Sequence, residues 1–235
     1  MLELRDVHSH YGLSHVLQGI HLRVEPGEVV GLFGRNGVGK TTVIKTIAGW
    51  VQPTRGEIVF ESRILSTMSA DQVSRLGIGL VPEDRRIFPG LTVEENLRLG
   101  FMQAPGVGRA EQKRKLDKIY QRFGRLAERR DQMGTTLSGG EQQMLAFARV
   151  LTGAPKLLLI DEPTEGLAPM IVEELFTLMR ELVDEGISIV LVEQNVHAAL
   201  ELTDRFYLVE RGQITFSGDA AEAASRAELV ERISV

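Results

Sequence analysis

Short, almost wholly apolar runs alternate along the chain with segments whose apolar residues recur every three or four positions. The apolar runs lie at 28–34, 77–83, 156–161 and 188–194. Such runs are typical of central strands in a parallel sheet, because that sheet is buried on both faces. Helical segments are predicted at 41–50 and at 171–186, where Gly186 provides the end. The alternation predicts an α/β fold with a parallel-sheet core.

The remaining segments follow other patterns. Residues 2–7 and 20–28 alternate like antiparallel strands, and 205–218 predicts a hairpin that turns at Arg211-Gly212. Residues 92–152 are helical, charged and without strand patterns, which indicates an inserted helical subdomain. We therefore expect a single domain, 1–235. Its nucleotide-binding core, with an N-terminal antiparallel β subdomain, takes up 1–91 and 153–235, and the helical subdomain takes up 92–152.

Composition narrows the function classes. With 235 residues, 43% of them hydrophobic, the chain can build the core of one domain. A net charge of -5 makes nucleic acid a poor partner, and the lack of cysteine excludes disulfides and thiolate metal sites. The sequence shows neither a signal peptide nor an apolar run that could span a bilayer, so we expect a protein that is soluble when isolated.

The most specific motif lies between the first predicted strand and helix. The sequence GRNGVGKTT matches the phosphate-binding loop G-x-x-x-x-G-K-[ST]. We expect its backbone amides to hold the phosphates of a nucleotide, Lys40 to reach the β- and γ-phosphates, and Thr41 to bind Mg²⁺. The predicted nucleotide-binding residues here are Gly34, Arg35, Asn36, Gly37, Val38, Gly39, Lys40, Thr41 and Thr42.

Two further motifs complete the predicted site. The strand at 156–161 ends in Asp161-Glu162, at the edge of the sheet where nucleotides bind, so Asp161 is expected to hold Mg²⁺ and Glu162 to activate water. The sequence LSGGEQ (137–142) predicts a helix start that Ser138 caps and that attracts an anion. A plain capped helix explains Ser138 but gives no reason for the two glycines that follow, which weaken a helix start.

These three motifs resemble those of the ATP-binding-cassette (ABC) ATPases, from Tyr11 to about Gly218. The resemblance implies the P-loop NTPase fold and hydrolysis of ATP with Mg²⁺. It also implies a head-to-tail dimer in which the signature residues bind the ATP held by a second subunit. These signature residues are Ser138, Gly139, Gly140 and Glu141.

The resemblance assigns three more positions. Tyr11 stands where the family places an aromatic residue that stacks on adenine. Glu83 stands at the position of a glutamine that senses Mg²⁺ and contacts the membrane partner, and Gln194 replaces a histidine that stabilises the γ-phosphate. The loop at 164–169 also lacks the family's usual aspartate. The resemblance thus implies Lys40, Glu162 and Gln194 as catalytic residues, and Thr41, Asp161 and Glu83 at the metal.

With these departures, the sequence resembles the second, shorter ATPase subunit of branched-chain amino acid importers. ATPases of urea and amide importers are similar enough to remain alternatives. The resemblance implies membrane permease subunits, a second ATPase subunit (a heterodimer, with a homodimer as the alternative) and, indirectly, a periplasmic binding protein. It places the chain at the cytoplasmic face of the inner membrane.

Two rival functions remain. One is an ABC ATPase that remodels DNA or ribosomes, although such members carry coiled coils, zinc insertions or a second cassette that this chain lacks. The other is a nucleotide-binding module without hydrolysis, because neutral Gln194 cannot supply a positive charge. The basic segment 109–130 also contains Glu111, Asp117 and Glu128, so we expect a solvated helix face there.

Overall fold

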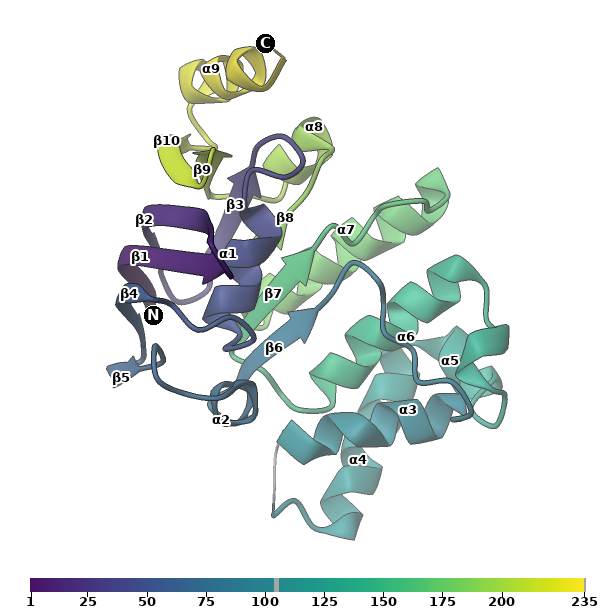
Figure 1. Ribbon diagram of the computed structural model, residues 1–235. Coiled ribbons are helices and arrows are strands. Elements are labelled where there is room, and N and C mark those ends of the chain that lie inside the picture. The colour runs from purple at the N-terminus through teal and green to yellow at the C-terminus, as the bar shows by residue number, and fades with distance from the viewer. Residues whose placement is uncertain (104–105, 235) are drawn as a thin grey trace.

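The structure is a computed structural model that describes residues 1–103 and 106–234. Residues 104–105 and 235, which belong to the predicted subdomains, lie outside the described residues. Two sheets and a group of helices are arranged side by side (Figure 1). This arrangement confirms the predicted α/β fold with a parallel-sheet core, an N-terminal antiparallel sheet and a helical insertion.

The N-terminal sheet is antiparallel throughout. It consists of β1 (Leu2–Tyr11), β2 (Ser14–Val24), β4 (Arg55–Phe60) and β5 (Arg63–Ile64), in the order β2-β1-β4-β5. Its inner face is apolar, and all of Leu2, Leu4, Ile20 and Ile58 are buried. The pattern at 2–7 and 20–28 predicts β1 and β2, whereas β4 and β5 were not predicted.

The second sheet has six strands. They are β3 (Val29–Phe33), β6 (Ile78–Val81), β7 (Leu157–Asp161), β8 (Ser188–Val192), β9 (Arg205–Glu210) and β10 (Gln213–Asp219), in the order β10-β9-β3-β8-β7-β6. All neighbours are parallel except β9 and β10, which form the predicted hairpin. Arg211 and Gly212 both have positive φ, 48° and 77°, as a tight hairpin turn requires.

The parallel sheet separates two apolar cores. On one face, Leu157, Leu159 and Val190 pack with α1 (Lys40–Ile47) and the N-terminal sheet. On the other face, Leu158 and Ile160 pack with the inserted helices and α7 (Pro169–Asp184). Alternate residues of each strand therefore enter different cores, which explains why these strands are apolar without interruption.

The segment 92–152 is helical, as predicted. It contains α3 (Val93–Leu99), α4 (Arg109–Arg122), α5 (Gly124–Glu128), α6 (Gly139–Leu151) and the 3₁₀ turns η1 (Gly100–Gln103) and η2 (Gly134–Thr136). Within its described residues the β pairing is limited to one isolated bridge, between Thr92 and Met133. Helix α4 buries only Leu116 and Ile119, so its basic residues form a solvated face, as expected.

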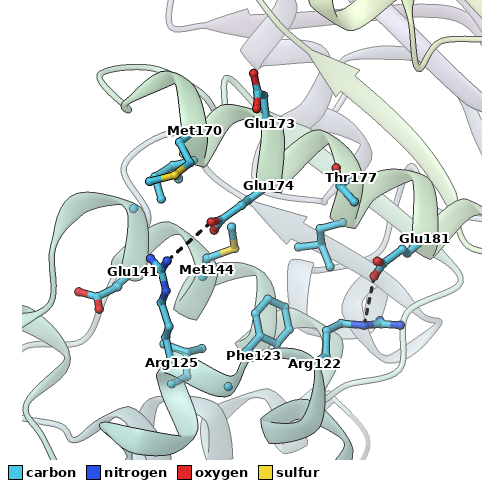
Figure 2. Close-up of a pocket in the computed structure, with 15 residues that line it drawn as sticks. Arg122, Phe123, Arg125, Glu141, Met144, Met170, Glu173, Glu174, Thr177 and Glu181 are labelled. Carbon is cyan, nitrogen blue, oxygen red and sulfur yellow. Dashed lines mark ion pairs between the residues drawn. The ribbon is translucent and has the colours of Figure 1, made fainter.

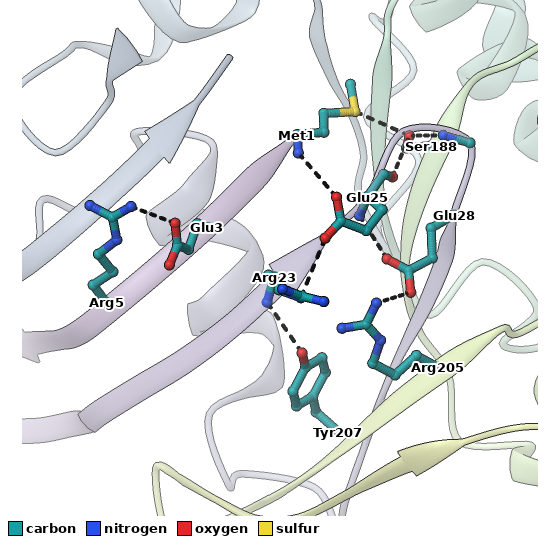
Figure 3. Close-up of polar contacts among 10 residues, drawn as sticks. Met1, Glu3, Arg5, Arg23, Glu25, Glu28, Ser188, Arg205 and Tyr207 are labelled. Atoms are coloured by element: carbon teal, nitrogen blue, oxygen red, sulfur yellow. Dashed lines mark hydrogen bonds and ion pairs between the residues drawn. The ribbon is translucent and has the colours of Figure 1, made fainter. Parts of the chain in front are cut away.

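Polar contacts join the two sheets near the N-terminus (Figure 3). The backbone N–H of Arg23 on β2 donates to the Tyr207 hydroxyl of β9 at 3.2 Å. Arg205 forms an ion pair with Glu28, which precedes β3, and the terminal ammonium of Met1 lies 3.9 Å from Glu25. Of these contacts, the bond from Arg23 to Tyr207 links β2 of the N-terminal sheet directly to β9 of the parallel sheet.

The other helices are short or peripheral. They are α2 (Ala70–Arg75), α8 (Val196–Leu200) and α9 (Ala223–Ser234). None of the helices in the described part of the chain is long and apolar enough to cross a membrane.

Candidate functional site

The predicted phosphate-binding loop lies where the strand order of the parallel sheet changes direction. It joins β3 to α1, and β3 has β8 on one side and β9 on the other. Parallel α/β sheets bind ligands at this point, beyond the carboxyl ends of the strands. Gly34 has a φ of 141°, and a Cβ atom there would lie 2.3 Å from the Val209 carbonyl oxygen. Only glycine therefore allows the loop to leave β3 in this direction.

The first turn of α1 is suited to an anion. Its N-cap is Gly39, with φ 114°, and among the described residues no side chain caps this end or adds an acidic charge to the first turn. Helices α2, α3 and α6 each begin with a capping box that satisfies backbone donors. Free amides and the positive end of the α1 dipole thus remain for phosphate groups.

Lys40 places a buried cation at the centre of the loop. Its side chain is 4% exposed, and its ammonium donates to the carbonyl oxygens of Gly34 at 2.8 Å and Arg35 at 3.1 Å. Burial lowers the pKa of Lys40, while Glu162, with its carboxylate 3.7 Å away, opposes this shift. A buried cation whose desolvation is only partly offset by the charges of Glu162 and Asp161 fits the charge of a nucleotide's phosphates.

Asp161 and Thr41 lie together, as a Mg²⁺ site of the predicted kind requires. The Thr41 hydroxyl donates to Asp161 Oδ1 at 3.1 Å. Burial raises the pKa of the Asp161 carboxyl, and the bond from Thr41 opposes this shift. A hydroxyl and a carboxylate are hard oxygen ligands that suit Mg²⁺ together with phosphate oxygens.

Glu162 is held in a strained backbone conformation beside two other predicted catalytic residues. Its φ is 46°, a left-handed value that is rare for residues other than glycine. Its backbone N–H donates to the Val192 carbonyl at 2.9 Å, which fixes the turn against β8. Gln194 donates from Nε2 to Glu162 Oε2 at 2.6 Å, and Lys40 lies on the side of Oε1. The carboxylate is therefore oriented from both sides.

A cavity of about 270 Å³ collects most of these groups. Of the predicted site residues it is lined by Asn36, Gly37, Gly39, Lys40, Thr41, Thr42, Glu83, Glu162 and Gln194. Val16 and Glu165, which were not predicted, also line it. Asp161 instead lines an adjacent cavity of about 170 Å³, which shares Thr41 and Glu83 with the first.

Tyr11 lies apart from this cavity. It ends β1, is 48% exposed and faces Ser14 across the β1–β2 turn. The structure therefore leaves the ring free for a planar ligand, and its contact with adenine remains a prediction. Gly34, Arg35 and Val38 belong to the loop backbone but do not line the cavity.

The carboxylate of Glu83 lies with those of Glu162 and Glu165. One oxygen from each lies within 4.8 Å of the others. Burial, followed by the charges of Glu162 and Glu165, raises the pKa of Glu83. Glu83 thus adds negative charge beside the Thr41–Asp161 pair, which favours a cation at this edge of the cavity.

We expect Glu83→Gln to stabilise the protein without nucleotide or Mg²⁺. Folding raises the pKa of Glu83, so the ionised carboxylate destabilises the folded protein at any pH above this raised pKa. At a pH below the pKa of Glu83 in the unfolded chain, the group is protonated in both states and the effect is absent. Glu83 is exposed, so solvent screening limits the gain in unfolding free energy to about 0.5 kcal/mol. Denaturant unfolding should show the gain at about pH 8 and its disappearance near pH 4.

The exposed carboxylate of Asp117 on α4 provides the control, since Asp117→Asn removes one negative charge outside the cavity and outside the group formed by Glu83, Glu162 and Glu165. No gain at high pH is expected from that change. An equal gain in both variants would mean that net charge, and not the cluster around Glu83, causes the effect.

Sequence reasoning missed Glu193. This residue is 2% exposed and ends the apolar run of β8. Its Oε1 accepts from the Thr164 N–H at 3.2 Å and the Thr164 hydroxyl at 2.5 Å, and its Oε2 accepts from the N–H groups of Gln194 at 2.9 Å and Asn195 at 3.2 Å. It therefore ties the loop of Glu162 to the loop of Gln194. A charged residue at the end of an apolar strand was the available signal.

The signature helix α6 begins with a capping box. The Ser138 hydroxyl accepts from the Glu141 N–H at 3.4 Å, and Glu141 accepts from the Ser138 N–H at 2.9 Å and forms an ion pair with Arg129 at 3.0 Å. The structure adds one local reason for Gly140. A Cβ atom there would lie 3.0 Å from two carbons of Ile171 on α7, so a larger residue would have to displace that side chain.

Gly140 and Glu141 border a separate cavity of about 520 Å³ (Figure 2). Side chains of α5 and α6 face α7 across it, including Met144, Met170 and the pair Arg125–Glu174 at 3.9 Å. None of the four signature residues lines the cavity of the phosphate-binding loop. Their contact with the ATP of another subunit remains a prediction.

Known proteins resemble the chain over most of its length. The sequence profile of the family described as ABC transporter matches residues 17–165. A high-affinity branched-chain amino acid transport ATP-binding protein of Pseudomonas aeruginosa is 42% identical over 221 residues, 94% of each chain. A probable branched-chain amino acid transport ATP-binding protein of Archaeoglobus fulgidus is 34% identical and covers 94% of this chain and 93% of its own.

A solved structure described as the ATP-binding subunit of an ABC transporter has the same fold. It is 30% identical, superposes with a TM-score of 0.87 and matches the whole of both chains. The phosphate-binding loop, the Asp161-Glu162 pair and the capped signature helix occur together on this fold. The chain belongs to the ABC transporter family and is one of its ATP-hydrolysing subunits.

Proposed function

We propose that the protein is the ATPase subunit of an importer that takes up branched-chain amino acids, or closely related amino acids, across the cytoplasmic membrane. One observation carries the catalytic part: the Glu162 carboxylate lies between Gln194 and Lys40 in the cavity of the phosphate-binding loop. The 42% identity to a branched-chain amino acid transport subunit over 94% of both chains supports the substrate class.

Different residues of the site bind the phosphates, hold Mg²⁺ and accept the proton of water. The loop 34–42 and the amides of α1 hold the phosphates of ATP, and Lys40 neutralises their charge. Mg²⁺, held by Thr41 and Asp161 with Glu83 nearby, would supply charge neutralisation at the phosphate oxygens. Glu162 accepts the proton of the attacking water, and Gln194 holds Glu162 in position.

The complete site needs a second ATPase subunit. Ser138, Gly139, Gly140 and Glu141 lie outside the cavity of their own chain, so in this proposal they bind the ATP of the partner in a head-to-tail dimer. The partner is a different ATPase subunit, with a second copy of this chain as the alternative. Membrane permease subunits hold the pair at the cytoplasmic face, and a periplasmic binding protein acts through them.

The assembled transporter tests this function. Co-expression with the permease subunits and the second ATPase subunit of a branched-chain amino acid importer should yield a membrane complex whose ATP turnover rises with a binding protein loaded with leucine, isoleucine or valine. Stimulation by urea or short amides instead would overturn the amino acid assignment. Failure to associate with any permease would favour an ABC ATPase outside transport.

Gln194→Ala should lower ATP turnover about 10²-fold with little change in ATP affinity, because it removes a donor that orients Glu162. Gln194→Glu should be at least as slow, since a second carboxylate would face Glu162. Gln194→His should be tolerated, because the imidazole retains an N–H donor. Turnover and nucleotide affinity of the assembled transporter provide the measurement.

His197→Ala on α8 is the matched control, because His197 is exposed and lies outside the cavity. Normal turnover in Gln194→Ala would mean that hydrolysis is organised without this amide, or takes place at the site held by the other subunit.

A further inference from the structure

We propose that three histidines on the β1–β2 hairpin form a binding site for a divalent transition-metal ion of the Zn²⁺ type. Four of the five histidines of the chain lie on these two strands. His8 and His10 stand two residues apart on β1, so they share one face of the sheet. His15 is the partner of His10 across the hairpin. Strand geometry therefore gathers three imidazoles in one place.

The rings are in direct contact. His8 Nδ1 lies 3.0 Å from His15 Nε2, and the His10 ring stacks on the His15 ring with centroids 4.2 Å apart and planes 6° apart. Two imidazole nitrogens that share a tetrahedral Zn²⁺, each about 2.05 Å from it, are about 3.3 Å apart. The separation of His8 and His15 is thus within a few tenths of an ångström of that required of two ligands.

Hydrogen bonds leave His10 Nε2 bare and make His8 Nδ1 the acceptor of the bond from His15 Nε2, so a metal ion between these two rings would replace the shared proton. His8 Nε2 lies 3.0 Å from Asp6 Oδ1 and donates to it, which leaves Nδ1 as an acceptor. The Thr54 hydroxyl donates to the His8 carbonyl at 3.3 Å, so it accepts from His10 Nδ1 at 2.9 Å and leaves His10 Nε2 bare. Metal-binding histidines typically donate their second ring nitrogen to a carboxylate or another oxygen in this way.

A three-histidine site requires the side chains of His10 and His15 to rotate out of their stacked arrangement. The three nitrogens do not converge within 4.8 Å in this structure, because His10 stacks on His15 and does not point beside it. His15 is exposed and has room to turn its ring out of the stack. Asp6 also forms an ion pair with Arg55, with Arg55 Nη2 2.9 Å from Asp6 Oδ2. This pair fixes the carboxylate that orients His8.

Imidazole ligands determine the class of ion. They bind Zn²⁺, Ni²⁺ and Cu²⁺ well, whereas Mg²⁺ prefers oxygen ligands. This site would therefore remain distinct from the Mg²⁺ expected at Thr41 and Asp161. A bound ion would join β1 to β2 just before the turn that follows Tyr11, and would make this end of the hairpin more rigid.

Calorimetric titration with ZnCl₂, on the full chain without a histidine tag, nucleotide or Mg²⁺, tests the site. We expect one Zn²⁺ per chain, and Co²⁺ should give the visible absorption of a nitrogen-coordinated ion. His8→Ala, His10→Ala and His15→Ala should each weaken binding at least about tenfold. His15 is exposed, so its variant is expected to fold, and circular dichroism provides the check.

Two matched variants exclude other sources of binding. His197→Ala removes a histidine outside the hairpin, and Glu83→Gln removes a carboxylate of the acidic group beside the phosphate-binding loop. Both should keep the affinity of the unmodified protein. Unchanged Zn²⁺ affinity in His10→Ala or His15→Ala, a loss in Glu83→Gln, or no binding at all would overturn the three-histidine site.

Discussion

Replacing Glu162 by glutamine should lower ATP turnover about 10³-fold while ATP binding is retained. The carboxylate is fixed from both sides, with Gln194 Nε2 at 2.6 Å from one oxygen and Lys40 Nζ at 3.7 Å from the other. A glutamine of the same shape keeps an oxygen that can accept from Gln194, but it cannot take a proton from water. The closed, ATP-bound dimer should therefore accumulate, because hydrolysis no longer reopens it.

Glu165→Gln is the matched control. Glu165 lines the same cavity and carries a carboxylate within 4.8 Å of that of Glu162, but it is exposed and lacks the bond to Gln194. Its substitution should leave most of the turnover. Single-turnover hydrolysis and size-exclusion chromatography with saturating MgATP, in the presence of the partner subunit, measure both effects. Equal losses in the two variants, or a monomeric Glu162→Gln protein, would contradict the assignment of the base.

Local sequence patterns predict the parts of the fold whose physical cause is local. The four apolar runs became β3, β6, β7 and β8, since a strand buried on both faces must be apolar throughout. The short strands β4 and β5 escaped prediction, because Arg55, Glu57 and Arg63 interrupt the apolar pattern. Strand β4 depends on pairing with β1, and β5 depends on pairing with β4, which no window of sequence shows.

The site residues also fall into those that local motifs predict and those that depend on tertiary contacts. Motif spacing identified Lys40, Thr41 and Asp161, and the structure brings their elements together at the end of β3. Glu193 was missed because its role depends on a contact between two loops 29 residues apart. Gln194 was expected to face the phosphates, and the structure adds that its amide donates to Glu162. The sequence shows the charged residue after an apolar strand, but the partners of such contacts between distant loops depend on tertiary structure.

Lys40→Ala should abolish measurable ATP turnover and weaken ATP binding about 10²-fold or more, because it removes a buried cation of the cavity that is expected to bind the phosphates. The Lys40 side chain is 4% exposed and donates to the carbonyls of Gly34 and Arg35. Ammonium burial lowers the pKa of Lys40, so its charge is costly to the empty protein. Removing it should change the free energy of unfolding by no more than about 1 kcal/mol.

Lys156→Ala is the control for charge, because Lys156 is exposed and pairs with Glu61 far from the loop. Its turnover should be normal. Nucleotide affinity by fluorescence titration and unfolding by denaturant separate a binding defect from a folding defect. A stable Lys40→Ala protein that still hydrolyses ATP at the normal rate would remove Lys40 from the site. If the free energy of unfolding of Lys40→Ala fell by several kcal/mol, the bonds from Lys40 to the Gly34 and Arg35 carbonyls would instead be what stabilises the loop without phosphate.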